Sequence, residues 1–514
     1  MKGISDFGVR NPFFIGIKMF KILLIFSFIF LVFGFHASAS FVVDENCIAA
    51  YHKIVSLRME EGKRLVEREK TINPSNDFPY LLDNYIDFIT LFISEDKKEF
   101  NLRKNNMDIR LERLKKGDIN SPFYLYAQAE IYLEWAIVRI KFKEYFTAAV
   151  EIQKAFKLLT ENKKKYPQFM PDNKGLGLLH ALSGAIPENY KWIAKLVGVK
   201  GTIQQGVGEL KELLEGLNTV NSSEYKFLHD EVFFILVMVE WNLQKDEGEA
   251  ARLILQPKFD AEDNPFLILA KAKIAAKMGN NDEAIKVLSS RPKSVEFYPF
   301  HYLSFMLGTA KLNRLDNDAA NYFQDYIHQF KGMNYIKTAW QKMAWIALLN
   351  NDSAKYKMLI KHCIEEGDDA VDEDKDAMKE AKTNDLPNIK LLKARLLCDG
   401  GYYQQSMEEI GGMKPLDFPK LKDQLEVTYR MARIYHLTKE YPKALEYYEI
   451  TMQNGVHVSY YFAANAALQM ALIYEKMNDK PNAITYYKTC LKMRKHDYQN
   501  SIDQKAEAGL NRLQ

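Results

Sequence analysis

Eight acidic side chains lie close together after residue 364, and carboxylates at short spacing are the usual ligands of calcium: Glu365, Glu366, Asp368, Asp369, Asp372, Glu373, Asp374 and Asp376. Aspartates alternate from Asp372, as at the start of a calcium-binding loop. The sixth position of such a loop needs glycine and the twelfth needs glutamate, but Ala377 and Thr383 stand there. We therefore predict no metal site and interpret residues 365–387 as a solvated acidic linker.

A second segment with chemical potential is Asn173–Leu210, which holds seven of the 25 glycines: Gly175, Gly177, Gly184, Gly198, Gly201, Gly206 and Gly208. A phosphate-binding loop needs its glycines between a strand and a helix, so that backbone N–H groups can reach the anion. The preceding residues 166–171 have no strand pattern, and no Gly-Lys-Ser/Thr follows. The pattern does not favour nucleotide binding.

The nucleophilic and metal-binding residue types are scattered. Four cysteines lie far apart without a C-x-x-C pair, which favours single buried thiols over disulfides or a zinc site: Cys47, Cys363, Cys398 and Cys490. The ten histidines occur singly, and neither H-E-x-x-H nor G-x-S-x-G is present. The sequence predicts no catalytic residues, no cofactor and no metal.

The glycines are better explained by helix packing. Thr202 and Gln205 form a capping box for a helix that contains Gly206 and Gly208, where each glycine costs about 1 kcal/mol relative to alanine. Such a cost indicates close approach of a neighbouring helix. Upstream, small residues share one helical face: Gly177, Ala181 and Gly184. With Pro187 and the turn at 198–201 as breaks, we predict a corner of three short helices within a helical region at 121–220.

The first 39 residues differ from the rest. Lys18 and Lys21 precede a mostly apolar run at 22–35, and Ala37-Ser38-Ala39 fits a secretory cleavage site. The run is shorter than the roughly 20 residues of a spanning helix, so we favour a signal peptide at 1–39 over an uncleaved anchor. This predicts export to the periplasm or the outer-membrane periphery of a Gram-negative bacterium.

The charge balance argues against a nucleic-acid partner. The net charge of +3 comes from the predicted signal, which has four Lys/Arg and one Asp. The remaining chain is neutral and has no long apolar run, so we expect a protein that is soluble or peripheral to a membrane.

Two segments repeat without gaps near the C-terminus. Residues 431–452 and 470–491 share a small residue, an aromatic three later, Ala nine after that and an aromatic four further on. Weaker copies begin at four other places: Ala272, Leu307, Trp340 and Ala394. A period near 39 residues with helical spacing predicts an all-α superhelical solenoid of helix pairs. We assign residues 40–120 to a helical cap, 221–364 to degenerate repeats and 388–514 to clear repeats.

The repeat pattern is similar to the tetratricopeptide repeat. The corner at Ser183–Pro187, the spacing of Gly198, Gly201 and Gly206, and the segment Leu391–Tyr403 also resemble the outer-membrane-type tetratricopeptide family, which includes eukaryotic inclusion-body clearance proteins and bacterial envelope relatives. The resemblance implies a noncatalytic role in binding a partner.

Tetratricopeptide grooves use outward residues of the first helix of each pair. Here that prediction gives six residues: Tyr429, Arg433, His436, Asn465, Leu472 and Glu475. We expect a protein or peptide partner. The alternative is a carbohydrate- or nutrient-binding envelope protein that works with an outer-membrane transporter.

Overall fold

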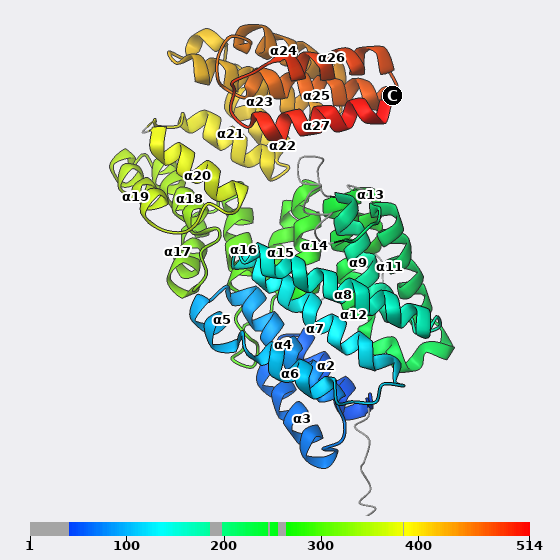
Figure 1. Cartoon of the computed structure of the whole chain (residues 1–514). Helices are drawn as coiled ribbons and strands as arrows, with labels where there is room; N and C mark the ends of the chain where they lie inside the picture. Colours follow the sequence, from blue (N-terminus) through cyan, green and yellow to red (C-terminus); the bar gives the residue numbers. More distant parts are fainter. Residues whose placement is uncertain (1–40, 186–197, 245–246, 255–263, 384, 514) are drawn as a thin grey trace, which may run out of the picture.

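The computed structural model of the 514-residue chain describes residues 41–185, 198–244, 247–254, 264–383 and 385–513. Helices follow one another along the chain and pack against their sequence neighbours, and this part of the chain contains no β-strand. Figure 1 shows the blue N-terminal helices at the lower end of the molecule and the orange and red C-terminal helices at the upper end. The fold is an all-α solenoid, as the repeat spacing predicts.

The first half of the solenoid comprises these helices: α2 (Glu45–Val55), α3 (Met59–Ile72), α4 (Phe78–Ser94), α5 (Lys97–Arg103), α6 (Asn106–Leu114), α7 (Pro122–Lys141), α8 (Tyr145–Lys165), α9 (Asp172–Ala185), α11 (Ile203–Leu217), α12 (His229–Val239) and α13 (Glu247–Ile254). A 3₁₀ segment, η2 (Val220–Leu228), precedes α12, and a π-helical turn, η3 (Glu240–Gln244), follows it.

The second half comprises α14 (Pro265–Lys277), α15 (Asn281–Ser289), α16 (His301–Asn313), α17 (Ala319–Gln329), α18 (Ile336–Leu349), α19 (Ser353–Glu365), α20 (Asp372–Thr383), α21 (Ile389–Asp399), α22 (Tyr403–Ile410), η4 (Pro415–Asp417), α23 (Leu421–Leu437), α24 (Tyr441–Gly455), α25 (Phe462–Lys476), α26 (Lys480–Lys492) and α27 (Gln499–Leu513).

One turn geometry recurs between paired helices. A residue with positive φ ends the first helix, and the next N–H donates to the carbonyl five residues earlier at 2.8–2.9 Å. In the described residues the positive-φ positions of these turns are Leu57, Lys143, Gly279, Leu315, Asn351, Gly401, Lys439 and Asn478. The last six belong to the copies visible in the sequence. Pairs α2/α3 and α7/α8 share the turn without the sequence pattern, so repeat-like pairs extend into the predicted cap.

The C-terminal repeats owe their packing to the residues that define the period. The alanines and second aromatics of both copies are fully buried: Ala432, Ala444, Tyr448, Ala471, Ala483 and Tyr487. The first aromatics stack on tyrosines of the paired helix, Tyr435 on Tyr447 and Tyr474 on Tyr486. Alanine therefore sets the point of helix contact, and the tyrosines fill the space beside it.

The glycine-rich region brings α9 and α11 into close contact. A Cβ at Gly206 would collide with the Gly177 carbonyl oxygen and lie 2.7 Å from Ala181 Cβ. Gly184 meets the start of α11 in the same way. Among the described residues, no atom lies within 4 Å of the place that a Gly208 Cβ would take, so close packing with them does not explain that glycine. The middle helix of the predicted corner lies outside the described residues, as does the predicted signal peptide.

The segment 365–387 corrects an expectation. It contains α20, which packs on α18 and α19, and Asp374 on this helix is fully buried. Its carboxylate accepts hydrogen bonds from the N-terminus of α18. Charge density alone indicates a solvated linker, whereas the Asp374 carboxylate has backbone and side-chain donors at the start of α18.

Two further observations concern the whole described chain. No helix there is long and apolar enough to cross a membrane. All four cysteines are buried and free, as expected from their separation.

Candidate functional site

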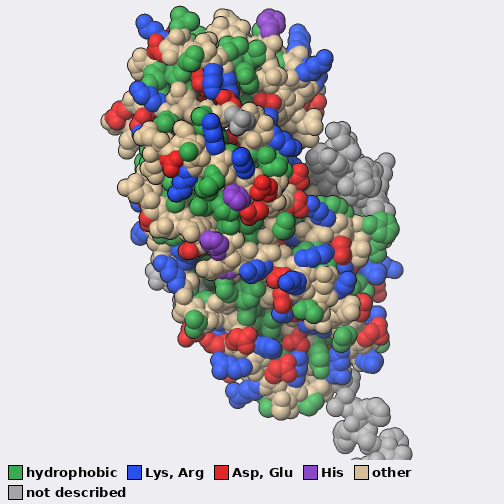
Figure 2. All heavy atoms as spheres, turned by 90° about the vertical axis from the view of Figure 1, so that its left-hand side faces the viewer, with side chains coloured by type: hydrophobic (Ala, Val, Ile, Leu, Met, Phe, Trp, Pro, Cys, Tyr) green, Lys and Arg blue, Asp and Glu red, His purple; other side chains and the backbone are tan. Residues whose placement is uncertain are grey.

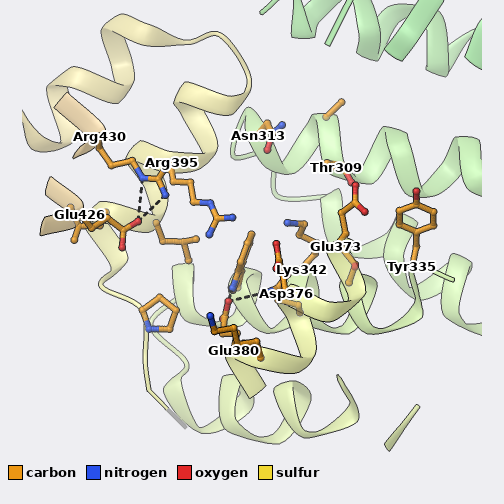
Figure 3. Close-up of a pocket in the computed structure, with 18 of the residues that line it drawn as sticks. Thr309, Asn313, Tyr335, Lys342, Glu373, Asp376, Glu380, Arg395, Glu426 and Arg430 are labelled. Atoms are coloured by element: carbon orange, nitrogen blue, oxygen red, sulfur yellow. Dashed lines mark hydrogen bonds and ion pairs between the residues drawn. The ribbon is translucent and has the colours of Figure 1, made fainter. Parts of the chain in front are cut away.

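A cavity with many polar side chains in its lining lies along the first helices of successive pairs. Its volume is about 430 Å³, and its walls come from α14, α16, α18, α20, α21 and α23. Figure 3 shows Arg395, Glu426 and Arg430 on one side, Thr309, Tyr335 and Glu373 on the other, and Lys342 and Asp376 between them. The cavity is thus a groove along one side of the solenoid with charged groups of both signs. We call it the charged groove.

Lys342 and Arg395 place two cations on one aromatic ring. Lys342 Nζ lies 3.8 Å and the Arg395 guanidinium carbon 4.9 Å from the Trp345 ring centroid. The face of an aromatic ring attracts cations, and the attraction strengthens where water is excluded. Burial, with the nearby Arg395 charge, lowers the pKa of Lys342 to about 7. An anion that entered the groove would offset both the loss of hydration of Lys342 and its repulsion by Arg395.

Few carboxylates lie close enough to Lys342 and Arg395 to neutralise their charges. Within the described residues, no carboxylate lies within ion-pair distance of Lys342, and Arg395 reaches only Asp399 at 3.8 Å. Arg430, by contrast, binds Glu426 Oε1 through Nη2 at 3.0 Å. Lys342 and Arg395 are therefore the pair available to an acidic group of a ligand.

Glu380 fixes the tryptophan beneath the cations. Its carboxylate accepts hydrogen bonds from Trp345 Nε1 at 2.7 Å, Gln341 Nε2 at 2.8 Å and Tyr356 hydroxyl at 2.8 Å. Three donors satisfy this carboxylate, so it holds the ring in place and leaves the cations free. The groove thus depends on α20, the helix that occupies the predicted linker.

The six sequence-predicted site residues lie outside the charged groove, three on α23 and three on α25. Tyr429 is buried, and its hydroxyl accepts a hydrogen bond from Asn465 Nδ2 at 2.8 Å. Arg433 donates to Gln469 Oε1 at 2.9 Å. These contacts join α23 to α25, so the three residues link successive repeats.

The other three behave similarly. Half-buried His436 packs against Tyr441 and Tyr448, and Glu475 forms an ion pair with Arg512 at 2.9 Å. Leu472 packs against the core of the last repeats. None of the six lines the charged groove, and their contact with a partner stays a prediction.

Sequence reasoning missed the groove residues for a local reason. Glu426 and Arg430 lie at i, i+4 on α23, which is an ordinary spacing for a solvated ion pair. The signal that could have identified them is that Lys342, Arg395 and Arg430 each sit on the first helix of a pair. Their convergence becomes visible only when the pairs are stacked.

A buried charged cluster in the first half could be mistaken for a catalytic centre. Lys174 Nζ lies 2.6 Å from Glu130 Oε2 and 2.9 Å from Glu231 Oε1, and it donates to the Tyr85 hydroxyl at 2.5 Å. Burial opposes the charge, but Glu130 and Glu231 together raise the pKa of Lys174 well above its ordinary value. The ammonium group stays protonated, which suits a structural role and not nucleophilic chemistry.

One group of potential metal ligands occurs among the described residues. Asp44, Cys47 and Glu69 bring ligand atoms within 4.8 Å of one another. Asp44 Oδ1 already accepts from the Cys47 backbone N–H at 2.8 Å, and Glu69 accepts from Asn76 at 3.1 Å. Burial and Asp44 raise the pKa of the Cys47 thiol, which disfavours the thiolate that a metal requires. The group is better described as a polar cap of α2.

Comparison with known families identifies a repeat family in the C-terminal part of the chain. Residues 423–496, which span α23 to α26, match the tetratricopeptide repeat family model. No curated protein matches the chain. With the all-helical solenoid, this match supports a tetratricopeptide-repeat protein; such repeats generally mediate protein–protein interaction and are generally noncatalytic.

Proposed function

We propose that this protein is an exported, noncatalytic scaffold of the cell envelope that binds a protein or peptide segment in the charged groove. The observation that carries the proposal is the placement of Lys342 and Arg395 over Trp345. Among the described residues, Lys342 has no carboxylate within ion-pair distance, and Arg395 reaches only Asp399, at 3.8 Å. A partner segment with an acidic side chain or a terminal carboxylate would supply the missing counter-charge.

The rest of the groove suits a peptide that carries both charges. Glu373 and Asp376 also line the groove, and the cavity volume of about 430 Å³ is in the range of ligand sites, about 300–1,000 Å³. The face shown in Figure 2 intersperses Lys and Arg with Asp and Glu. That mixture differs from the single-sign surface typical of nucleic-acid binding, so we propose a protein partner there.

The envelope location rests on the predicted signal peptide, and the resemblance to bacterial relatives of the inclusion-body clearance family supports it. A peripheral membrane association is part of the same proposal. No specific observation favours the alternative of a carbohydrate- or nutrient-binding protein paired with an outer-membrane transporter.

Crosslinking in cells, followed by affinity purification of the full chain, tests the proposal. We expect the double variant Lys342→Glu, Arg395→Glu to lose its co-purified partner, because both groove cations are reversed. The matched control Arg433→Glu reverses a cation that joins α23 to α25 outside the groove. Loss of the partner in Arg433→Glu alone would move the binding surface to the six sequence-predicted residues.

Fractionation of the same cells tests the location. Recovery of shortened chain with the periplasm or outer membrane is expected. Recovery of full-length chain in the cytoplasm would contradict the export proposal.

A further inference from the structure

The first half of the solenoid contains a second cavity of about 510 Å³ with a mostly apolar wall. Its lining includes Phe88 and Phe92 of α4, Leu178 of α9, Phe234 of α12 and Phe266 of α14. An apolar cavity of this size falls within the range of small-molecule sites, about 300–1,000 Å³. We call it the apolar cavity.

The two cavities adjoin. Tyr302 and Tyr335 line both of them, and Ala272 of the charged groove is next in sequence to Lys273 of the apolar cavity. On α14, Phe266, Leu269 and Lys273 follow one face in that order. Lys273 therefore lies where the apolar wall meets the charged groove.

Lys273 differs from the other ionisable groups of the apolar wall. Lys141 is paired with Glu95 at 2.6 Å, and Lys174 is paired with Glu130 at 2.6 Å. Within the described residues, no ion pair or hydrogen bond joins Lys273 to another side chain. Burial lowers the pKa of Lys273, and Glu373 only partly offsets this, as expected for an ammonium without a close counter-charge.

The wall of the apolar cavity suits a hydrocarbon chain better than an apolar peptide. A peptide brings an N–H and a carbonyl with each residue, and these need partners when they leave water. Glu134 accepts a hydrogen bond from Asn84 at 2.6 Å, and Glu95 is paired with Lys141. The second oxygen of Glu134 and one oxygen of Glu130 have no partner among the described residues, but both are buried. A hydrocarbon chain needs no such partners.

We propose that the apolar cavity binds a long-chain fatty acid, with the hydrocarbon among the aromatic side chains and the carboxylate at Lys273. This site goes beyond the proposed peptide-binding function, and its anchoring cation, Lys273, does not line the charged groove. The carboxylate supplies the counter-charge that Lys273 lacks, and the chain covers apolar surface that otherwise faces water.

Titration calorimetry on lipid-stripped full-length protein tests the site, with octanoate, dodecanoate and hexadecanoate as probes. Affinity should rise about fourfold for each buried methylene, which corresponds to ~0.8 kcal/mol. Methyl hexadecanoate should bind about tenfold or more weakly than hexadecanoate, because it cannot form the charge-assisted contact. Absence of binding by hexadecanoate, or affinity independent of chain length, would overturn the proposal.

Three variants locate the ligand. Lys273→Met should weaken hexadecanoate binding about tenfold or more and leave methyl hexadecanoate unchanged. Lys277→Met, which removes an exposed lysine of the same helix outside both cavities, is the matched control. Leu178→Trp should fill the cavity and abolish binding of both ligands while circular dichroism reports a folded protein. Equal affinities for Lys273→Met and Lys277→Met would contradict the head-group assignment.

A charge-reversal variant and a competition measurement separate this site from the proposed peptide function. Arg395→Glu should leave hexadecanoate binding intact, whatever it does to partner capture. An uncharged leucine-rich peptide should fail to displace hexadecanoate. Full displacement by that peptide would assign the apolar cavity to a peptide and overturn the fatty-acid proposal.

Discussion

Asp374 caps helix α18 at Thr338: its Oδ1 atom accepts hydrogen bonds from the backbone N–H and the hydroxyl of Thr338, each at 2.8 Å. Its other oxygen accepts from the Tyr335 backbone N–H at 2.5 Å. The cap comes from α20, 36 residues further along the chain. A negative charge at a helix N-terminus satisfies free N–H groups and interacts favourably with the helix dipole.

Replacing this cap should destabilise the middle of the solenoid. We expect Asp374→Ala to lower the free energy of unfolding by about 2–4 kcal/mol, because three donors lose a buried acceptor. Asp372→Ala, at a side chain that is 87% exposed on the same helix, should change it by about 0.5 kcal/mol or less. Urea titration followed by circular dichroism measures both. Equal changes in the free energy of unfolding for Asp374→Ala and Asp372→Ala would favour the solvated linker that the composition of this segment predicts.

Two glycines in α11 should respond to alanine in opposite directions. Gly206→Ala should destabilise the protein by about 1–3 kcal/mol or more, because its Cβ meets the α9 backbone. Gly208→Ala should stabilise it by about 0.5–1 kcal/mol, since open space surrounds that position and alanine favours helix. Thermal unfolding compares the two variants directly. Destabilisation by both would mean that α11 is packed on two sides.

Binding of an acidic partner peptide should depend on pH through Lys342. The pKa of this lysine is lowered to about 7 by burial and by Arg395, so the free groove loses one positive charge as the pH rises through 7. Affinity should therefore fall between pH 6 and pH 8.5. In Lys342→Arg the decline should be absent, because a guanidinium stays charged. Fluorescence anisotropy with a labelled acidic peptide provides the measurement, and an identical pH profile in both proteins would remove Lys342 from the site.

His436 should make the C-terminal repeats sensitive to mild acid. Burial, together with Arg433 and Lys476, lowers the folded-state pKa from 6.5 to about 4. Between these values the unfolded chain binds a proton that the folded chain does not, so stability falls as the pH drops from 6.5 towards 4. His436→Gln should reduce this loss.

The control for that experiment is His457→Gln, at an exposed position after α24. Urea midpoints at pH 7 and pH 4.5 should differ less in His436→Gln than in the wild-type chain or in His457→Gln. A midpoint shift in His436→Gln as large as that of the wild type would show that His436 titrates normally in the fold.

Much of the architecture follows from the sequence alone because the signals are local. Ala432 with Tyr435 and Ala444 with Tyr448 lie at helical spacings, so a single helix pair already contains the information for its own packing. The same holds for Gly177 and Gly206, because a glycine inside a helix indicates close contact with a neighbouring helix. These local spacings are sufficient to predict an all-α solenoid.

Only the tertiary structure decided which surfaces face the cavities. Glu426 and Arg430 face the charged groove because of the rotation between successive helix pairs. That rotation is set by contacts between pairs, such as the hydrogen bond from Arg433 to Gln469, whose partners lie more than 30 residues apart in the sequence. The sequence around Asp374 predicts a solvated charge, whereas in the fold the N-terminus of α18 places N–H groups beside its carboxylate. Helical periodicity is a property of neighbours in sequence, whereas counter-charges and cavities are made by residues that meet only after the repeats have stacked.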